Sequence, residues 1–128
     1  MEKSTLVGID IGTSKIRCVL YDTKGKLLFN YSKNTPLVKI KNENYNPVDK
    51  ILEILIKLLK QTFKSARNNN LIIKGLSISS VGEAGVPIDK DFNPLMDIIP
   101  WYDQRTEDIR NQYIKNNENK IYKFTGLN

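Results

Sequence analysis

Hydrophobic and polar residues alternate with a period of two over the first part of the chain. The alternation predicts two strands, over residues 5–11 and 15–22, and a third from about 27 to 33. The polar turn at 22–26 joins the second strand to the third, so we expect an antiparallel three-stranded meander. From Lys33 to Tyr45 the chain is polar, and we expect an irregular surface segment there.

The pattern changes to helical spacing after Asn46. Asparagine is a common N-cap and proline is common at the first helical position, so we expect a helix from Pro47 to about Arg67. It should end in the run 68–70, because asparagine tolerates the left-handed conformation that terminates helices. The apolar side chains expected to pack on the sheet are Val48, Ile51, Leu52, Leu55, Leu58, Leu59 and Phe63.

A fourth strand is predicted from Leu71 to Ser80, with Ile72, Leu76 and Ile78 as buried bulk. Because it follows a helix that follows the meander, a right-handed crossover should place it parallel to the first strand and beside it. Ligands in open α/β sheets gather at the carboxyl ends of strands. The small-residue loop from Ser79 to Gly85 is therefore a candidate binding segment.

Shorter elements are expected in the remainder. The pattern predicts short strands over Val86–Asp89 and Ile98–Trp101, a helix from about Thr106 to Lys115, and a short amphipathic piece around Ile121 to Phe124. Taken with the first half, this order predicts an α/β fold built on a mixed sheet.

Composition narrows the class of protein. The chain has 128 residues, 40% of them hydrophobic and 27% charged, as in an ordinary soluble protein with one domain's worth of sequence. The net charge of +6 comes mostly from lysines spread along the chain, without interleaved aromatics, which argues against a nucleic-acid partner. No apolar stretch reaches membrane-spanning length and no signal-type segment precedes Asp10, so we expect no membrane partner and a cytoplasmic location.

Two residue counts narrow the chemistry further. Cys18 is the only cysteine and falls on the apolar alternation of the second strand, which excludes a disulfide framework and favours a core position in a reducing compartment. The chain has no histidine, the commonest general base and zinc ligand. Its chemistry should therefore rely on carboxylates and phosphate contacts.

The segment from Val7 to Arg17 carries the first candidate site. Gly12 lets the backbone turn tightly and approach a ligand, while the N–H groups and hydroxyls of Thr13 and Ser14 can face phosphate oxygens. The planar, positively charged guanidinium of Arg17 could bind the same anion. Asp10 lies at the end of a buried strand, and a hydrated Mg²⁺ could satisfy its carboxylate. The alternative is an ordinary hairpin whose Asp10 bonds to backbone amides, and this pattern alone does not decide between the two.

Two later motifs suggest a polyhydroxylated ligand. Glu83 lies in the small-residue loop and can accept several hydroxyl hydrogen bonds, although it could also be a solvated charge. The run Trp101-Tyr102-Asp103-Gln104-Arg105 combines aromatic faces with a carboxylate and a guanidinium, which is how proteins bind sugars. Asp103 could instead cap the helix that follows, and one residue can do both.

The order of these motifs resembles the start of the FGGY family of carbohydrate kinases. The resemblance rests on the D-I-G-T-S hairpin, the long helix, the S-I-S-S-V-G-E-A-G strand end and I-P-W-Y-D-Q-R, and it runs from about Leu6 to Asn128. It implies an actin-like ATPase fold with a ribonuclease-H-like core, of which residues 1–128 would be the N-terminal, incomplete portion of the first domain. The element that precedes the first long helix in that family is represented only by Glu43-Asn44-Tyr45-Asn46-Pro47.

The resemblance also implies roles for individual residues. Asp10 would lie near the Mg²⁺ of ATP and hold it through water. Glu83 falls on the acceptor-contacting position, which is Glu in glycerol kinases and His in xylulose kinases. The remaining positions would surround the phosphates, namely Gly12, Thr13, Ser14 and Arg17, or line the sugar site, namely Trp101, Asp103 and Arg105.

The implied reaction is transfer of the γ-phosphoryl group of ATP to a hydroxyl of a sugar or polyol. Members of the family are several times longer, and their general base and adenosine-binding domain would follow Asn128. We therefore expect this chain to have no turnover by itself, and to expose sheet surface that favours self-association or a homo-oligomer. The alternatives are an actin-like or chaperone-like ATPase and a non-catalytic ligand-binding module.

Overall fold

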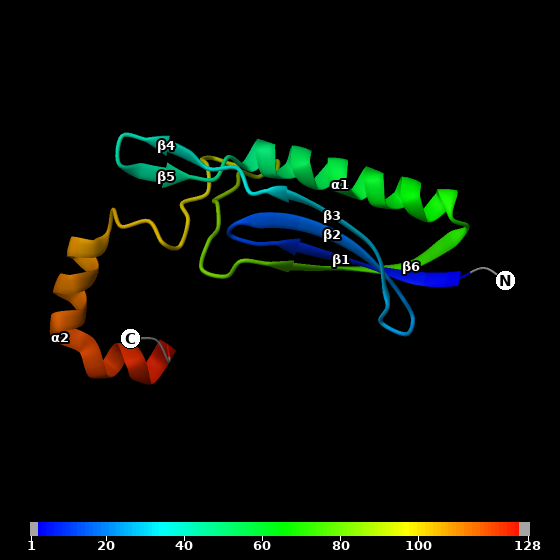
Figure 1. Cartoon of the computed structure of the whole chain (residues 1–128). Helices are drawn as coiled ribbons and strands as arrows, with labels where there is room; N and C mark the ends of the chain where they lie inside the picture. Colours follow the sequence, from blue (N-terminus) through cyan, green and yellow to red (C-terminus); the bar gives the residue numbers. More distant parts are fainter. Residues whose placement is uncertain (1–2, 126–128) are drawn as a thin grey trace.

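The centre of the fold is a four-stranded mixed sheet with one helix across a face (Figure 1). The computed structural model describes residues 3–125, without several side chains between 116 and 125. The strand order is β3-β2-β1-β6. The bounds of these elements are β1 Lys3–Ile11, β2 Lys15–Asp22, β3 Leu27–Asn34, α1 Val48–Asn68 and β6 Leu71–Ser80.

Strand pairing brings the ends of β1 and β6 together. β1 pairs antiparallel with β2, and β2 pairs antiparallel with β3. β6 lies parallel to β1, with Ile11 opposite Ser80, as the crossover through α1 requires. The loops that leave β1 and β6 at their carboxyl ends therefore start side by side, as the sequence predicts.

The core lies between the sheet and α1. Alternate residues of β1 and β2 face the helix, and Ile16, Cys18 and Leu20 are completely buried there. The helix contributes Ile51 and Leu58, whose spacing of seven places them on one face. The burial of Cys18 confirms its predicted core position.

The structure corrects the prediction that 33–45 is irregular. β3 continues to Asn34, and a hairpin follows, formed by β4 (Val38–Ile40) and β5 (Glu43–Tyr45). Its turn places Lys41 at a φ of 55°, a left-handed conformation that usually favours glycine or asparagine. The usual sequence mark of a tight hairpin is therefore missing, which explains why the segment looked like a loop.

The start of α1 also differs from the prediction. The first helical residue is Val48, and Pro47 takes the N-cap position without a side-chain cap. The Asn46 amide instead donates to the carbonyl oxygen of Pro36 at 2.8 Å. The Val48 N–H finds its acceptor in the Asp97 carboxylate, 3.2 Å away, so a residue distant in sequence satisfies the helix end. At the other end, Asn70 has the expected positive φ of 53°.

Several apolar residues predicted to be buried are exposed. Leu76 and Ile78 are 46% and 57% exposed, because α1 covers only the start of β6, where Ile73 packs against the core. On α1 itself, Leu52 and Phe63 are 47% and 45% exposed. Their side of the helix lies beyond the sheet, and no element within residues 3–125 covers it.

The segment after β6 is mostly irregular. The predicted strands over 86–89 and 98–101 reduce to isolated bridges, Ile88 with Pro94 and Asn46 with Ile98. The predicted helix at 106–115 is part of a longer one, α2 (Glu107–Thr125), which is kinked at Asn117 and stands apart from the sheet (Figure 1). The predicted piece at 121–124 belongs to α2, but its amphipathic character depends on side chains outside the described ones.

Candidate functional site

The turn between β1 and β2 is held in one conformation by its surroundings. The Gly12 N–H donates to the Lys15 carbonyl at 3.0 Å, and a Cβ at Gly12 would lie 3.1 Å from that oxygen. Thr35 fastens the other side, because its hydroxyl donates to the Gly12 carbonyl at 2.7 Å and its N–H to the Ser14 carbonyl at 3.0 Å. Thr13 and Ser14 consequently present exposed hydroxyls from a fixed backbone.

Asp10 and Arg17 lie beside this turn on the sheet face that α1 does not cover. Their strands pair them directly, and Arg17 Nη1 is 3.1 Å from Asp10 Oδ2. Both side chains are about half exposed, at 44% for Asp10 and 49% for Arg17. The alternative in which Asp10 is satisfied by backbone amides is not observed, since its partner within residues 3–125 is this guanidinium.

The loop after β6 starts against the same turn. Its Val81 N–H donates to the Ile11 carbonyl at 2.9 Å. Two residues later, Glu83 adopts a φ of 55°, which costs a non-glycine residue about 1 kcal/mol. Glu83 shares a cavity of about 550 Å³ with Trp101 and Asp103, so three of the predicted sugar-contacting residues meet there.

Arg105 binds several groups at once behind this cavity. Its Nε and Nη2 atoms lie 2.7 and 3.2 Å from the two carboxylate oxygens of Asp103. The guanidinium also donates to Tyr45 Oη and to the Asn44 carbonyl, both at 3.1 Å, and stacks 4.6 Å from the centre of the Tyr45 ring. Glu43 adds an ion pair at 3.6 Å. The cluster therefore fastens the β4–β5 hairpin to the segment that follows Trp101.

This cluster fixes the charge of Asp103. The Arg105 guanidinium, aided by the Asn44 N–H, holds the pKa of the Asp103 carboxyl far below its usual range. The Asp103 carboxylate in turn raises the pKa of Arg105. The Asp103 side chain is only 2% exposed. The structure corrects the capping alternative, because Asp103 accepts from Arg105 and Asn44 rather than from the first turn of α2.

Trp101 connects the two groups of candidate residues. Its indole Nε1–H donates to the Thr13 hydroxyl at 3.2 Å, across 88 positions of sequence. The side chain is 57% exposed, so much of the ring remains open to a ligand. A small cavity of about 40 Å³ lies between the two loops, lined by Gly12, Val81 and Ala84 among others.

Sequence reasoning missed three residues that organise this region. Thr35 and Tyr45 fall in the segment predicted to be irregular, and Asp97 lies in a stretch without regular structure. Tyr45 belongs to the short run Glu43–Pro47, where the sequence only partly represents the element that precedes the long helix in the family it resembles, and that position was the available signal. Neither Thr35 nor Asp97 has a local pattern that would reveal its distant hydrogen-bond partner.

The acidic residues in the described part of the chain do not form a metal site by themselves. Among residues 3–125 there is no cluster of three or more His, Cys, Asp or Glu side chains that could hold an ion by itself. A single half-exposed carboxylate such as Asp10 fits Mg²⁺, which keeps several waters and binds through few protein groups.

None of the helices in the described part of the chain is long and apolar enough to cross a bilayer.

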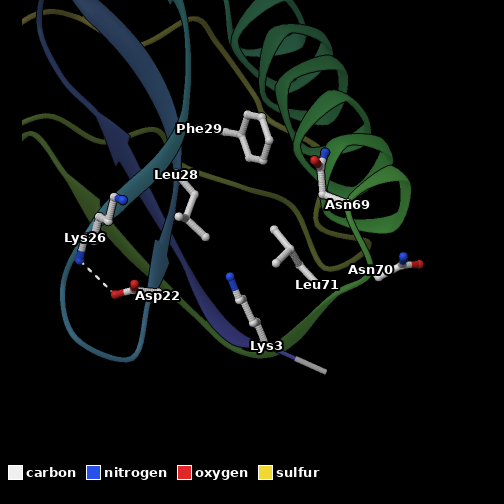
Figure 2. A pocket seen from close by; sticks show the side chains of 8 residues that line it. All are labelled: Lys3, Asp22, Lys26, Leu28, Phe29, Asn69, Asn70 and Leu71. Atoms are coloured by element: carbon white, nitrogen blue, oxygen red, sulfur yellow. Dashed lines mark hydrogen bonds between the residues drawn. The ribbon is translucent and has the colours of Figure 1, made fainter. Parts of the chain in front are cut away.

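A further cavity of about 370 Å³ lies at the opposite end of the sheet, where β1 and β6 begin (Figure 2). Figure 2 shows Lys3, Leu28 and Leu71 pointing toward the same space. The Lys26 N–H donates to the Asp22 carboxylate at 2.9 Å. Residues of the predicted phosphate and sugar sites do not line it. The candidate functional site is therefore the end of the sheet where β1 and β6 finish.

The family model and the curated relatives that match this chain are all carbohydrate kinases. Residues 5–128 match the family described as FGGY family of carbohydrate kinases, N-terminal domain. A xylulose kinase from Staphylococcus epidermidis is 31% identical over 107 residues, which cover 82% of this chain and 21% of that protein. A gluconokinase from Bacillus subtilis is 29% identical over 126 residues, covering 96% of this chain and 24% of that protein.

Solved structures show the same fold. A gluconate kinase from Lactobacillus acidophilus aligns with a TM-score of 0.80 at 25% identity, covering 95% of this chain and 25% of that chain. A glycerol kinase from Plasmodium falciparum aligns with a TM-score of 0.87 at 21% identity, covering 94% of this chain and 25% of that one. The chain thus spans between 21% and 24% of the length of these curated relatives.

Proposed function

Because this chain belongs to the FGGY family of carbohydrate kinases, we propose that it supplies the sugar-binding and phosphate-binding surfaces of an ATP-dependent sugar or polyol kinase. The curated relatives are several times longer, so phosphoryl transfer is proposed for the whole protein. The sheet order, with antiparallel β1 to β3 and parallel β6, supports the further proposal of a ribonuclease-H-like, actin-like ATPase core.

The observation that carries this proposal is the junction of two candidate sites at one end of the sheet. Glu83, Trp101 and Asp103 line one cavity, and Trp101 is hydrogen-bonded to the turn that carries Thr13. The exposed ring of Trp101 offers a face on which the C–H groups of a sugar can stack. The Glu83 carboxylate would accept hydrogen bonds from the sugar hydroxyls.

The turn between β1 and β2 would hold the phosphates of ATP. Thr13 and Ser14 present exposed hydroxyls from a rigid backbone, which suits recognition of phosphate oxygens. Asp10 would hold the hydrated Mg²⁺ and Arg17 would approach the phosphate charge. Phosphoryl transfer needs mainly positioning and charge neutralisation, and these are the contributions that the residues of this chain would make.

Asp103 and Arg105 contribute in a different way from Glu83. Because Arg105 makes hydrogen bonds to Asp103, Tyr45 and Asn44, its role at the sugar site would be to position the cavity wall. Asp103 is nearly covered, yet its segment borders the cavity, so a sugar hydroxyl would meet a rigid rim there.

The test is an assay of ADP release by the whole protein with xylulose, gluconate and glycerol as candidate acceptors. We expect release to depend on one of them, and Glu83→Gln to lower kcat/KM for it at least about tenfold, since a sugar hydroxyl would lose its charged acceptor. Glu53→Gln, at an exposed position of α1, is the matched control.

Two outcomes would contradict the proposal. ATP hydrolysis that no sugar or polyol accelerates would favour an actin-like or chaperone-like ATPase. Sugar phosphorylation by residues 1–128 alone would show that the chain does more than supply binding surfaces.

A further inference from the structure

The hydrogen bond between Trp101 and Thr13 joins the cavity shared by Glu83, Trp101 and Asp103 to the β1–β2 turn over residues 12–14. We propose that this bond couples the two sites, so that a sugar bound against Trp101 orients the Thr13 hydroxyl toward phosphate and each ligand tightens the binding of the other. The inference rests on the proposed function, because it assumes that the two surfaces bind a sugar and a phosphate.

The hydrogen bond between Trp101 and Thr13 has a fixed direction. An indole N–H can only donate, so the Thr13 oxygen must be the acceptor and its own hydrogen points elsewhere. Within residues 3–125 no group accepts that hydrogen. A phosphate oxygen would complete the chain from indole to hydroxyl to anion, and successive hydrogen bonds of this kind polarise and strengthen one another.

The backbones that carry Thr13 and Trp101 are both held in place by hydrogen bonds. Thr13 lies between Gly12 and Ser14, whose carbonyls are both held by Thr35. Trp101 follows the buried Pro100, whose carbonyl accepts from the Asp103 N–H at 3.0 Å. The remaining freedom is therefore in the two side chains, and above all in the half-exposed Trp101 ring.

A ligand on the ring removes that freedom. A sugar stacked on Trp101 would restrict its rotamers and hold the indole N–H on Thr13, so phosphate would bind a hydroxyl that is already oriented. Linkage requires the reverse effect to be equal, so phosphate must tighten sugar binding by the same factor. A coupling that depends on one hydrogen bond should be about fivefold.

The chain allows a direct readout because Trp101 is its only tryptophan. The spectrum of the 128-residue chain therefore contains a single indole ¹H–¹⁵N signal, which belongs to Trp101. The probes are magnesium tripolyphosphate and xylulose, gluconate or glycerol, each titrated alone and then in the presence of the other. Thr13→Val removes the hydroxyl, Thr13→Ser restores it, and Trp101→Phe removes the indole donor while keeping a ring.

Thr23→Val is the matched control, since Thr23 is an exposed threonine of the β2–β3 turn at the other end of the sheet. We expect tripolyphosphate to shift the indole signal in the original chain, in Thr13→Ser and in Thr23→Val, but not in Thr13→Val. We also expect each ligand to improve the affinity of the other about fivefold. Thr13→Val should weaken the binding of tripolyphosphate alone and Trp101→Phe that of the sugar alone, and in both variants the affinity for one ligand should no longer depend on the other.

The outcomes separate failure of this inference from failure of the proposed function. If both ligands bind but their affinities are independent, or if the coupling survives in Thr13→Val, the inference is wrong and the proposed function stands. If the original chain binds neither a sugar nor tripolyphosphate, both fail together. Backbone spectra of each variant show whether it has folded.

Discussion

Arg17 and Asp10 face each other across β2 and β1, with 3.1 Å between Nη1 and Oδ2. They are the two charged groups proposed to meet Mg²⁺ and phosphate, and here they neutralise one another. A half-exposed ion pair contributes at most about 1 kcal/mol to folding. Bound magnesium and phosphate would give each group a new partner at little cost in stability.

Arg17→Gln should consequently affect binding more than folding. We expect the free energy of unfolding to change by less than about 1 kcal/mol, while the affinity for magnesium tripolyphosphate falls about tenfold because a charge-assisted bond is lost. Urea unfolding and calorimetric titration measure the two effects. Lys50→Gln removes a charge from an exposed ion pair on α1 and is the control. If Lys50→Gln loses as much affinity for magnesium tripolyphosphate, the effect of Arg17→Gln comes from the change in net charge and not from a specific contact.

Glu83→Gly should separate the backbone of Glu83 from its carboxylate. Glycine adopts the positive φ of 55° without strain, which stabilises the folded state. Its greater freedom in the unfolded chain destabilises the folded state by about 0.5–1 kcal/mol, so we expect the free energy of unfolding to stay within about 0.5 kcal/mol of the original. Phe92→Gly is a matched control, since Phe92 has a φ of 64° in an exposed turn. Sugar affinity should be lost only in Glu83→Gly. If it persists, Glu83 is a solvated loop charge.

Arg105→Lys should loosen the β4–β5 hairpin, because an ammonium cannot reproduce the planar set of bonds to Asp103, Tyr45 and Asn44. The Asn44 N–H, which donates to Asp103 at 2.8 Å, is the reporter. We expect its hydrogen-exchange protection to fall about tenfold and sugar affinity to fall with it. Arg67→Lys, in the last turn of α1, should change neither. Unaltered protection at Asn44 would show that the guanidinium geometry is dispensable.

The depressed pKa of Asp103 predicts how the stability of the chain depends on pH. Because Arg105 and the Asn44 N–H lower the pKa of Asp103 in the folded state, the contribution of its carboxylate is complete above about pH 5 and is lost as pH falls below about 4. The difference in unfolding free energy between the original chain and Asp103→Asn should be constant at neutral pH and shrink in acid. Urea titrations across this range measure it, and a difference that does not vary with pH contradicts the assignment.

Cys18 should react with thiol reagents only through unfolding. Burial raises the pKa of its thiol, an effect partly offset by the hydrogen bond with Thr62, and the side chain is completely buried. We expect reaction at least about 1,000-fold slower than for an exposed thiol. Thr23→Cys introduces such a thiol in the same chain, and a rapid reaction of both would place Cys18 outside the core.

The fold was largely predictable where periodicity is strong. The strands over 5–11, 15–22 and 71–80 and the helix α1 follow from alternation and helical spacing, because each packs on one common core. The β4–β5 hairpin was not predictable, since its turn uses Lys41 at a positive φ. Leu76 and Ile78 are exposed because α1 does not extend over their part of β6. The local sequence does not determine which part of the sheet the helix covers.

The candidate site was predictable as a set of residues but not as an arrangement. Strand order brings the turn at 12–14 next to the loop at 81–85, as the crossover argument expects. The bond from Trp101 to Thr13 and the cluster around Arg105 connect residues many positions apart. Which residues Trp101 and Arg105 contact depends on how the irregular segment from 86 to 106 crosses the end of the sheet.

The pairing of β1 with β6 sets the order in which this region can form. The hairpins of β1, β2 and β3 join near neighbours, whereas the Thr5 hydroxyl reaches the Ile72 carbonyl across 67 positions. During synthesis the strand that carries Asp10 can be paired long before β6 leaves the ribosome, because local contacts close fast and distant ones wait for the intervening chain. The turn between β1 and β2 would thus be held early by Thr35, and it would meet Trp101 only when the segment from 86 to 106 docks on the end of the sheet.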